Sequence, residues 1–417
     1  MTATTIVGAP RAASPSRQLI TVLGLVSVFA PFGTDMYLPG LASIGRDLRT
    51  GAIGVQITLS AFLLGMSVGH LTLGRLSDRY GRRGPLLACL AICAIAGAVC
   101  ALAPTAGALA GARFVQGLTG SAGLVIGRAV VSDLARGRRA VHAFAAQMWV
   151  LAAVPVVAPP IGGVLVAAAG WRAVFGALAL LSLLMFLAAL IALPETLPLH
   201  ARTVSPLLPR GDLALLRDRG HLGPAAAFVL AFGALAAYLA AAPFFLPHLL
   251  GPHIAAVAAT LGLNALALVL VAALGARLAH RFRPLWPARA GLAVLLLCAV
   301  AIGVLAVTGR LTADTCLPPL LLAVASLGLV LGDTSAVALS RAPRAAGTAA
   351  ALMATAQFAF GAVMAPLAGA GGARDAVPMS LIMGACAVLA LLALAASRAG
   401  RSASTLSDRP AGHPRVR

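Results

Sequence analysis

The sequence predicts an all-α integral membrane protein, with twelve transmembrane helices arranged as two six-helix pseudo-repeats. Three observations predict this fold class: a strongly apolar composition, twelve long apolar runs, and a repeat that relates the two halves of the chain. Of the 417 residues, 60% are hydrophobic and only 10% are charged, whereas soluble domains carry about 25% charged residues. The apolar runs do not alternate with polar residues, so they indicate membrane-spanning helices and not the strands of a barrel.

Most of the twelve runs reach the length of about 20 residues that a helix needs to cross the hydrocarbon core. A polar arm at 1–18 is expected to be disordered and cytoplasmic, and the run after it is too long for a cleaved signal peptide. The N-terminal bundle at 19–193 contains runs at 19–40, 53–74, 85–103, 107–132, 142–168 and 172–193. The C-terminal bundle at 222–397 follows a cytoplasmic linker at 194–221 and precedes a cytoplasmic tail at 398–417. Its runs cover 222–247, 254–278, 288–308, 315–338, 346–369 and 376–397.

The basic residues are all arginines, and most of them stand in the connections that follow even-numbered runs. Cytoplasmic loops are rich in basic residues, so both termini and the linker are expected on the cytoplasmic side of the inner membrane. The net charge of +20 is then a topology signal, and no nucleic-acid partner is expected. The arginines that carry this argument are Arg75, Arg79, Arg82, Arg83, Arg136, Arg138, Arg139, Arg202, Arg210, Arg217, Arg219, Arg281, Arg283, Arg289, Arg341 and Arg344.

The two halves of the chain resemble each other at a spacing of about 205 residues. The string GLVIGR at 123–128 matches GLVLGD at 328–333, and APPIGG at 158–163 matches APLAGA at 365–370. Six helices therefore map onto six with the same orientation. Repeats of this kind around a central site are typical of carriers that alternate access.

An arginine-rich segment, GRLSDRYGRR at 74–83, joins the second and third runs. It is similar to the G-x-L-x-D-R-x-G-R-R signature of the major facilitator superfamily, and in that family it locks the cytoplasmic side and switches during transport. Its aspartate is expected to accept from the amides that open the eleventh helix near Gly347, and Asp133 is expected to pair with its arginines. Alternatively, the segment is only a topology signal. The gating residues expected here are Gly74, Asp78, Arg79, Gly81, Arg82, Arg83 and Asp133.

Two further strings narrow the resemblance. The fifth run carries VPVVAPPIGG at 154–163, similar to the motif of drug–proton antiporters, with Pro159, Gly162 and Gly163 as its kink and packing residues. Ala158 departs from the glycine of the general motif, and a purely structural kink is the alternative. The string TDMYLP in the first run, together with Arg128 in the fourth, resembles the Bcr/CflA branch, named for bicyclomycin and chloramphenicol resistance.

That resemblance implies a proton-driven exporter of small amphipathic drugs or antibiotics that works by alternating access. It implies no cofactor, a monomer in the lipid bilayer, and a cavity between helices 1, 4, 7 and 10. Four residues are expected in this cavity: Tyr37, Gln116, Phe244 and Phe245. A proton symporter that imports a metabolite is an alternative with the same fold. A membrane-embedded enzyme or receptor is a third, but no nucleophile–base pair or metal spacing is present, so no catalytic or metal site is expected.

Asp35 is expected to bind the coupling proton, with Arg113 as its electrostatic partner. Ionisable residues inside a membrane helix are costly and usually functional, and few acidic residues lie well inside the apolar runs. With the first helix ending near 40, both residues lie about 8–9 Å from the external surface. Burial and a nearby cation act in opposite senses on a carboxylate, so helix movements can change its proton affinity. A structural ion pair without proton traffic is the alternative.

Three other intramembrane groups carry expectations. Arg128 and Asp333 occupy equivalent places in the two repeats, so they can meet when the cytoplasmic mouth closes. Local pairing of each, or contact of Arg128 with substrate, is the alternative. His70, within the second run, is either a proton relay or a hydrogen-bonded packing residue.

The orientation can be tested with reporter fusions in the 194–221 linker and after Arg417. Both fusions are expected to show cytoplasmic activity, because the arginine bias places these segments inside the cell. Periplasmic activity at either position would contradict the topology.

Overall fold

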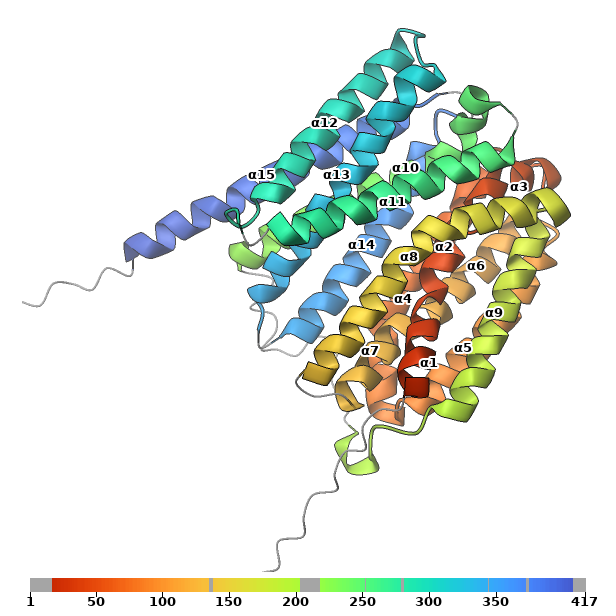
Figure 1. The fold of residues 1–417 in the computed structure, drawn as a ribbon, viewed down its shortest axis with the longest axis vertical. Helices are drawn as coiled ribbons and strands as arrows, with labels where there is room; N and C mark the ends of the chain where they lie inside the picture. The colour runs from red at the N-terminus through yellow and green to blue at the C-terminus, as the bar shows by residue number, and fades with distance from the viewer. Residues whose placement is uncertain are drawn as a thin grey trace, which may run out of the picture.

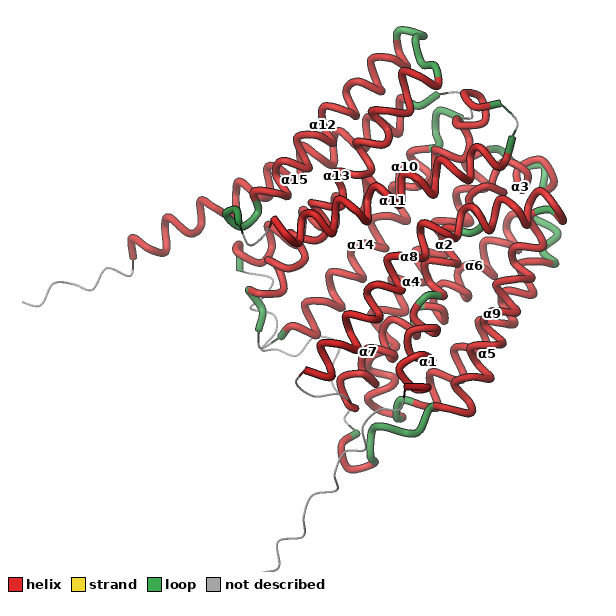
Figure 2. The backbone as a smooth tube through the Cα atoms, in the orientation of Figure 1, coloured by secondary structure: helices red, strands yellow, loops and turns green. Residues whose placement is uncertain are grey.

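The computed structural model describes residues 17–134, 138–202, 218–251, 253–278, 281–343, 345–372 and 375–407. Within these residues the regular structure is helical, and twelve helices are long and apolar enough to cross a membrane. Figure 1 shows two bundles side by side, the first coloured red to yellow-green and the second green to blue, and Figure 2 shows only helices joined by loops. The predicted fold class is confirmed.

The N-terminal bundle has six membrane spans, the first of which is broken into short helices. That first span, Thr21–Asp47, extends beyond the predicted end at 40 because the chain continues helically after Pro39. Its pieces are α1 (Arg17–Ser27), α2 (Phe29–Asp35), η1 (Leu38–Gly40) and α3 (Leu41–Asp47). The other elements are α4 (Ala52–Tyr80), α5 (Arg83–Ala101), α6 (Ala106–Gly120), α7 (Ala122–Leu134), α8 (Arg138–Ala169), α9 (Trp171–Ala192) and η2 (Leu199–Ala201).

The C-terminal bundle also has six spans. They are α10 (Arg219–Leu250), α11 (Ile254–Leu278), α12 (Trp286–Val307), α13 (Ala313–Ser340), α14 (Ala346–Ala368) and α15 (Val377–Ser407). The bundles meet where α4 packs against α14 and α8 packs against α11. These helices bound the space at the centre of the molecule.

Glycines allow the helices within the N-terminal bundle to approach closely. A Cβ atom on Gly65 would collide with the backbone of Phe114 and Leu118, and one on Gly117 would collide with the backbone of Phe62. Small residues of this kind drive helix association in lipid, where apolar side chains gain nothing from leaving water. Contact between α4 and α6 therefore depends on two glycines, one from each helix.

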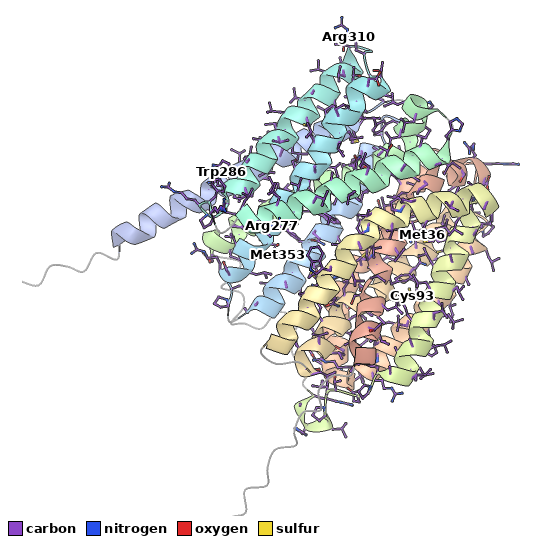
Figure 3. All side chains as sticks on the ribbon, viewed as in Figure 1. Met36, Cys93, Arg277, Trp286, Arg310 and Met353 are labelled. Atoms are coloured by element: carbon purple, nitrogen blue, oxygen red, sulfur yellow. The ribbon has the colours of Figure 1, made fainter. Side chains whose placement is uncertain are left out.

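The outer surface is covered by apolar side chains with polar groups at its two ends (Figure 3). Arg310 lies at one end, whereas Arg277 and Trp286 lie near the opposite end of the same bundle. Trp286 stacks on Phe282 with ring centroids 4.7 Å apart. Aromatic rings are typical of the level where lipid headgroups meet hydrocarbon, so this pair marks the end that is expected to be cytoplasmic.

Close contacts join the two bundles near the end that is expected to be external. Gln56, at the start of α4, is fully buried and donates from Nε2 to the Ala240 carbonyl oxygen of α10 at 3.1 Å. Its amide also fills the space beside Gly369, at the end of α14, where a Cβ atom would collide with it. A single glutamine thus joins α4 to two helices of the other bundle.

Gly369→Ala is expected to destabilise the protein by about 1–3 kcal/mol, because the added methyl group overpacks the site and displaces the Gln56 amide from Ala240. In a Gln56→Ala background the same change should cost nothing further, since the colliding amide is gone. Gly332→Ala is the matched control, because no atom lies within 4 Å of its Cβ position. Thermal unfolding of the purified variants tests this, and equal unfolding temperatures for the Gly369 and Gly332 variants would contradict it.

Candidate functional site

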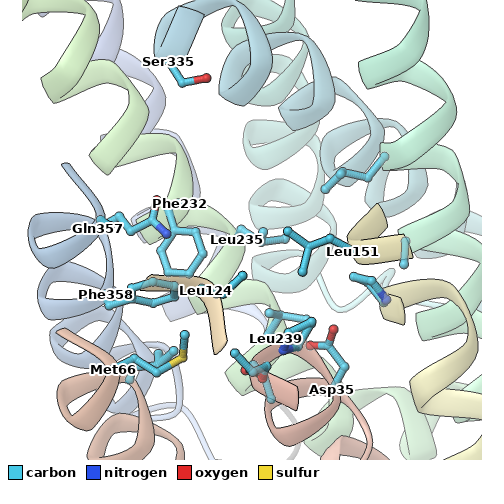
Figure 4. A pocket seen from close by; sticks show the side chains of 18 of the residues that line it. Asp35, Met66, Leu124, Leu151, Phe232, Leu235, Leu239, Ser335, Gln357 and Phe358 are labelled. Carbon is cyan, nitrogen blue, oxygen red and sulfur yellow. The ribbon is translucent and has the colours of Figure 1, made fainter. Parts of the chain in front are cut away.

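A cavity of about 680 Å³ lies between the two bundles. It is within the range of ligand pockets, about 300–1,000 Å³. Its walls come from α2, η1, α4, α7 and α8 of the first bundle and from α10, α11, α13 and α14 of the second. These include parts of the first, fourth, seventh and tenth spans, as the family resemblance implies. The walls are mostly apolar (Figure 4).

Asp35 is the one acidic residue among those that line this cavity. It ends α2, its side chain points into the cavity (Figure 4), and only 7% of its surface is exposed. No hydrogen bond or ion pair to the carboxylate occurs within the described part of the chain. A carboxylate without a partner in apolar surroundings is an expensive group, and such groups are commonly functional.

Arg113 does not form an ion pair with Asp35 in this structure. Its side chain is fully buried and donates to Gln116 Oε1 at 2.7 Å. The guanidinium lies 4.0 Å from the ring centre of Phe62 and 4.3 Å from that of Tyr37, which are cation–π contacts. Its Nε and Nη2 atoms have no hydrogen-bond partner among the described residues. Aromatic rings, and not a carboxylate, therefore surround this charge.

The distances of Asp35 and Arg113 from their helix ends do not match, because the first span is longer than predicted. That span ends at Asp47, so Asp35 lies twelve residues, or about 18 Å, from its end. Arg113 lies only seven residues, or about 10 Å, from the start of α6 at Ala106. The Arg113 guanidinium nevertheless lies against Tyr37, two residues after Asp35. The two charges are therefore separated by direction: Asp35 faces the cavity, whereas Arg113 faces the interior of the N-terminal bundle.

The four residues expected in the cavity do not line it. Tyr37 and Gln116 are buried inside the N-terminal bundle around Arg113, because Tyr37 is two residues after Asp35 and faces the opposite side of the chain. Phe244 and Phe245 are also buried. They lie about 9 Å beyond Tyr238 along α10, past the end of the cavity.

The cavity instead takes its aromatic and polar groups from positions without a family motif. The rings come from Phe144, Phe228, Phe232, Tyr238 and Phe358, and the other polar groups include His70, Ser335 and Gln357. Asn264 Nδ2 donates to the Tyr238 hydroxyl at 2.8 Å. This hydrogen bond holds the Tyr238 ring in place. The sequence signal for these residues is polarity within an apolar run, which marks functional positions in membrane helices.

Arg128 and Asp333 are not paired with each other. Arg128 lines the cavity, whereas Asp333 is half-buried and accepts from the Ala288 amide at 3.2 Å. That amide belongs to the first turn of α12, where the helix dipole favours a negative charge. In this conformation Asp333 therefore caps the neighbouring helix α12. Local pairing of Asp333 was the alternative to its contact with Arg128.

The arginine-rich segment is mostly helical, which differs from the predicted loop. Residues 74–80 belong to the last turns of α4, and the turn is made at Gly81, whose φ of 95° suits glycine. Arg82 is the centre of the cluster: its Nε lies 3.1 Å from Asp133 Oδ2, and its Nη1 donates to Asp78 and Ser77. The expected pairing of Asp133 with an arginine of this segment is confirmed.

Asp78 pairs with Arg82 on the same segment, and no contact to the start of α14 is found among the described residues. The remaining arginines take local partners: Arg83 donates to the Leu190 carbonyl oxygen at 2.9 Å, and Arg79 lies over the Tyr80 ring. Gly74 faces Val125 of α7, with space for a methyl group. The cluster thus holds α4, α7 and the end of α9 together within one bundle.

Glu195, in the connection after α9, is the acidic partner that the sequence analysis did not assign. Its carboxylate accepts from the backbone amides of Arg82 at 2.8 Å and Arg83 at 3.3 Å, and it lies 3.8 Å from the Arg202 guanidinium. Burial acts to raise the pKa of Glu195, but the backbone hydrogen bonds and the charge of Arg202 outweigh it and hold the pKa below its usual range. The turn at Gly81 is therefore tied to an ionised carboxylate at neutral pH.

The proline–glycine motif of the fifth span forms part of the contact between the bundles. Pro159 lines the cavity, while Gly162 lies against the Met36 backbone and Gly163 allows Ala258 of α11 to approach. From α11 of the C-terminal bundle, a Cβ atom on Gly262 would lie 2.9 Å from the Val156 carbonyl oxygen of α8. The expectation of close packing is confirmed at these positions: Gly162 packs within the N-terminal bundle, whereas Gly163 packs between the bundles.

Comparison with known proteins shows the same architecture. A family model described as Major Facilitator Superfamily matches residues 23–366. The chain is 34% identical over 386 residues to an uncharacterized MFS-type transporter, YdgK, of Bacillus subtilis, covering 90% of this chain and 94% of that protein. It is 30% identical over 384 residues to a bicyclomycin resistance protein homolog of Haemophilus influenzae, again covering 90% and 94%.

Solved structures match over nearly the whole chain at low sequence identity. A bacterial homolog of the human lysosomal transporter Spinster, in an inward-facing and occupied conformation, aligns with a TM-score of 0.75 at 16% identity, covering 96% of this chain and all of that one. A D-xylose–proton symporter aligns with a TM-score of 0.70 at 16% identity, covering 90% of this chain and 96% of that one. At these identities the likeness concerns the fold alone.

Proposed function

Because the chain belongs to the major facilitator superfamily, we propose that it exports small amphipathic drugs by proton-coupled alternating access. It is a transporter and not an enzyme, since its family and relatives are transporters. The relative named for bicyclomycin resistance covers 90% of the chain, which supports antibiotics of the chloramphenicol or bicyclomycin kind as substrates. Such a carrier requires no cofactor, and the proton gradient drives it.

The observation that carries the proposal is the lone carboxylate of Asp35 in an apolar cavity between two bundles. Asp35 is the one acidic group in the described cavity wall. It can exchange a proton, and in its ionised form it can attract a positively polarised group of a drug. Hydrophobic walls hold the rest of an amphipathic molecule. When Asp35 holds a proton, the group is neutral and the cavity can change its access without moving a charge through lipid.

In this proposal the positive charge of Arg113 acts on the Asp35 carboxylate from a distance, without contacting it. It is buried beside Tyr37, two residues from Asp35, so movement of the broken first span changes the distance between the two charges. A nearby cation favours the ionised form of a carboxylate. We propose that this dependence on helix position lets the carboxylate release its proton at one stage of the cycle and bind it at another.

Among the described residues, Asp78 bonds within its own segment, and Arg128 and Asp333 do not meet. We propose that, when the cytoplasmic mouth closes, the cluster around Arg82 docks on the start of α14, and that Arg128 and Asp333 then meet across the axis. Reversing both charges should restore transport lost in the single variants, and a double variant no better than the worse single one would argue against the pair.

Import of a metabolite with protons is the competing function, and the structural likeness to a xylose–proton symporter fits it through the fold alone. The proline–glycine motif and the bicyclomycin-resistance relative favour export. We propose a monomer in the inner membrane with both termini in the cytoplasm. The arginine bias of the even connections supports the orientation of the termini. Inverted vesicles with an acidic lumen separate the two functions, because an exporter accumulates drug in them.

Asp35→Asn is expected to insert and fold, to keep part of its affinity for chloramphenicol, and to lose proton-driven accumulation at least tenfold. Asparagine keeps the shape of the side chain but cannot exchange a proton. The test is drug uptake into inverted vesicles, with exposed Asp314→Asn as the matched control at wild-type rate. Normal gradient-driven uptake by Asp35→Asn would refute the assignment and move the coupling role to Asp333.

A further inference from the structure

His70 of α4 lines the same cavity as Asp35, with 9% of its surface exposed. It is one of few side chains on the cavity wall that can both donate and accept hydrogen bonds. A histidine in such a place either carries protons or recognises a ligand. The hydrogen bonds of the imidazole and the charges around it indicate which of these two roles His70 has.

The backbone fixes which ring nitrogen carries the hydrogen. His70 Nδ1 lies 2.9 Å from the Met66 carbonyl oxygen, one turn earlier in α4. A carbonyl oxygen can only accept, so Nδ1 must donate. In the neutral ring the hydrogen is therefore on Nδ1, and Nε2 presents a lone pair.

No hydrogen bond to Nε2 occurs within the described part of the chain. Phe358 of α14 lies against the ring with centroids 5.1 Å apart, and Phe232 of α10 meets Phe358 edge-on at 5.2 Å. All three rings line the cavity. The free lone pair of His70, on α4 of the first bundle, thus stands beside an aromatic wall that the second bundle provides.

The charges around His70 argue against a role in carrying protons. Among the groups that line the cavity, α7 contributes Arg128, α2 contributes Asp35, and the neighbouring residues of α10 and α14 contribute rings and the Gln357 amide. No carboxylate is hydrogen-bonded to the imidazole among the described residues. A second cation beside the permanent charge of Arg128 in an apolar cavity would be repelled.

We propose that His70 is a specificity-determining residue whose Nε2 accepts a hydrogen bond from a hydroxyl or amide N–H of the substrate. The aromatic wall would hold a ring of the same molecule, so the site selects neutral amphipathic compounds that combine a ring with a hydrogen-bond donor. The inference rests on the proposed function and names the substrate chemistry of the same cavity. Apolar compounds without a donor would leave the lone pair unpaired and bind less tightly.

Two substitutions separate recognition from proton transport. In His70→Gln the amide reaches the place of Nε2 and can accept, but it cannot take up a proton. In His70→Asn the shorter amide reaches only the place of Nδ1, so the bond to Met66 is kept and the acceptor is lost. The probes are chloramphenicol, an analogue without its two hydroxyl groups, and an analogue methylated at the amide nitrogen.

The affinity of purified protein for the three probes is expected to depend on whether the variant keeps a hydrogen-bond acceptor at the place of Nε2. His70→Asn should weaken chloramphenicol binding about tenfold and His70→Gln by less than about threefold, which is the range for losing one buried hydrogen bond. With at least one analogue, His70→Asn should bind as tightly as the wild type. His70→Gln should also keep proton-driven uptake into inverted vesicles.

An equal effect of His70→Asn on all three probes would overturn the inference, and so would loss of proton-driven uptake in His70→Gln with drug binding intact. If a variant fails to fold, the wild type alone still decides, because it must bind at least one analogue more weakly than chloramphenicol. A wild type that binds and exports none of a panel of drugs overturns the proposed function and this inference together. A wild type that exports drugs while His70→Asn recognises all probes normally overturns the inference alone.

Discussion

The cost of an unpaired charge in an apolar cavity is the constraint on which this transporter depends. An ionised carboxylate away from water is several kcal/mol less stable than one in solution unless it is paired. Asp35 faces the cavity with no protein partner among the described residues, so in our account a proton or a polar ligand must provide the compensation. Proton and drug then depend on the same group. That dependence couples them without any direct contact between the two.

The rest of the structure keeps this site between two bodies that can move relative to each other. Glycines bring α4 against α6 within one bundle, and Gly163 and Gly262 bring α8 against α11 between bundles. Small residues at the contact between α8 and α11 suit helices that must slide or rock relative to each other. Gln56 adds a buried polar contact at one end. Of the four ion pairs of the described residues, three lie inside the first bundle and the fourth lies in the connection that follows it. A second hydrogen bond between the bundles, from Ser67 Oγ to the Thr355 carbonyl oxygen at 2.8 Å, lies further along α4.

Much of the fold follows from the sequence because the bilayer permits so few solutions. Twelve apolar runs and a repeat near 205 residues were enough to predict the helices and their two groups. The place of Asp133 at the cytoplasmic end of the fourth run predicted its contact with the arginine-rich segment. The sequence does not show which side of each helix faces the cavity. Tyr37 and Asp35, two residues apart in the first span, were both expected to face it, and only Asp35 does. The expected ion pair is absent because Asp35 turns toward the cavity, whereas Arg113 lies among aromatic rings inside the N-terminal bundle. Cavity residues such as His70 and Tyr238 depend on packing between distant helices, which no single run reveals.

Release of protons on drug binding tests the central claim most directly. Purified protein in weakly buffered solution near neutral pH is mixed with chloramphenicol, and a pH indicator follows the proton count. Because one carboxylate lines the described cavity wall, the account predicts release of up to about one proton per bound drug. The same experiment on Asp35→Asn should show binding without release. Binding to the wild type with no change in proton occupancy at any pH, or equal release from Asp35→Asn, would contradict it.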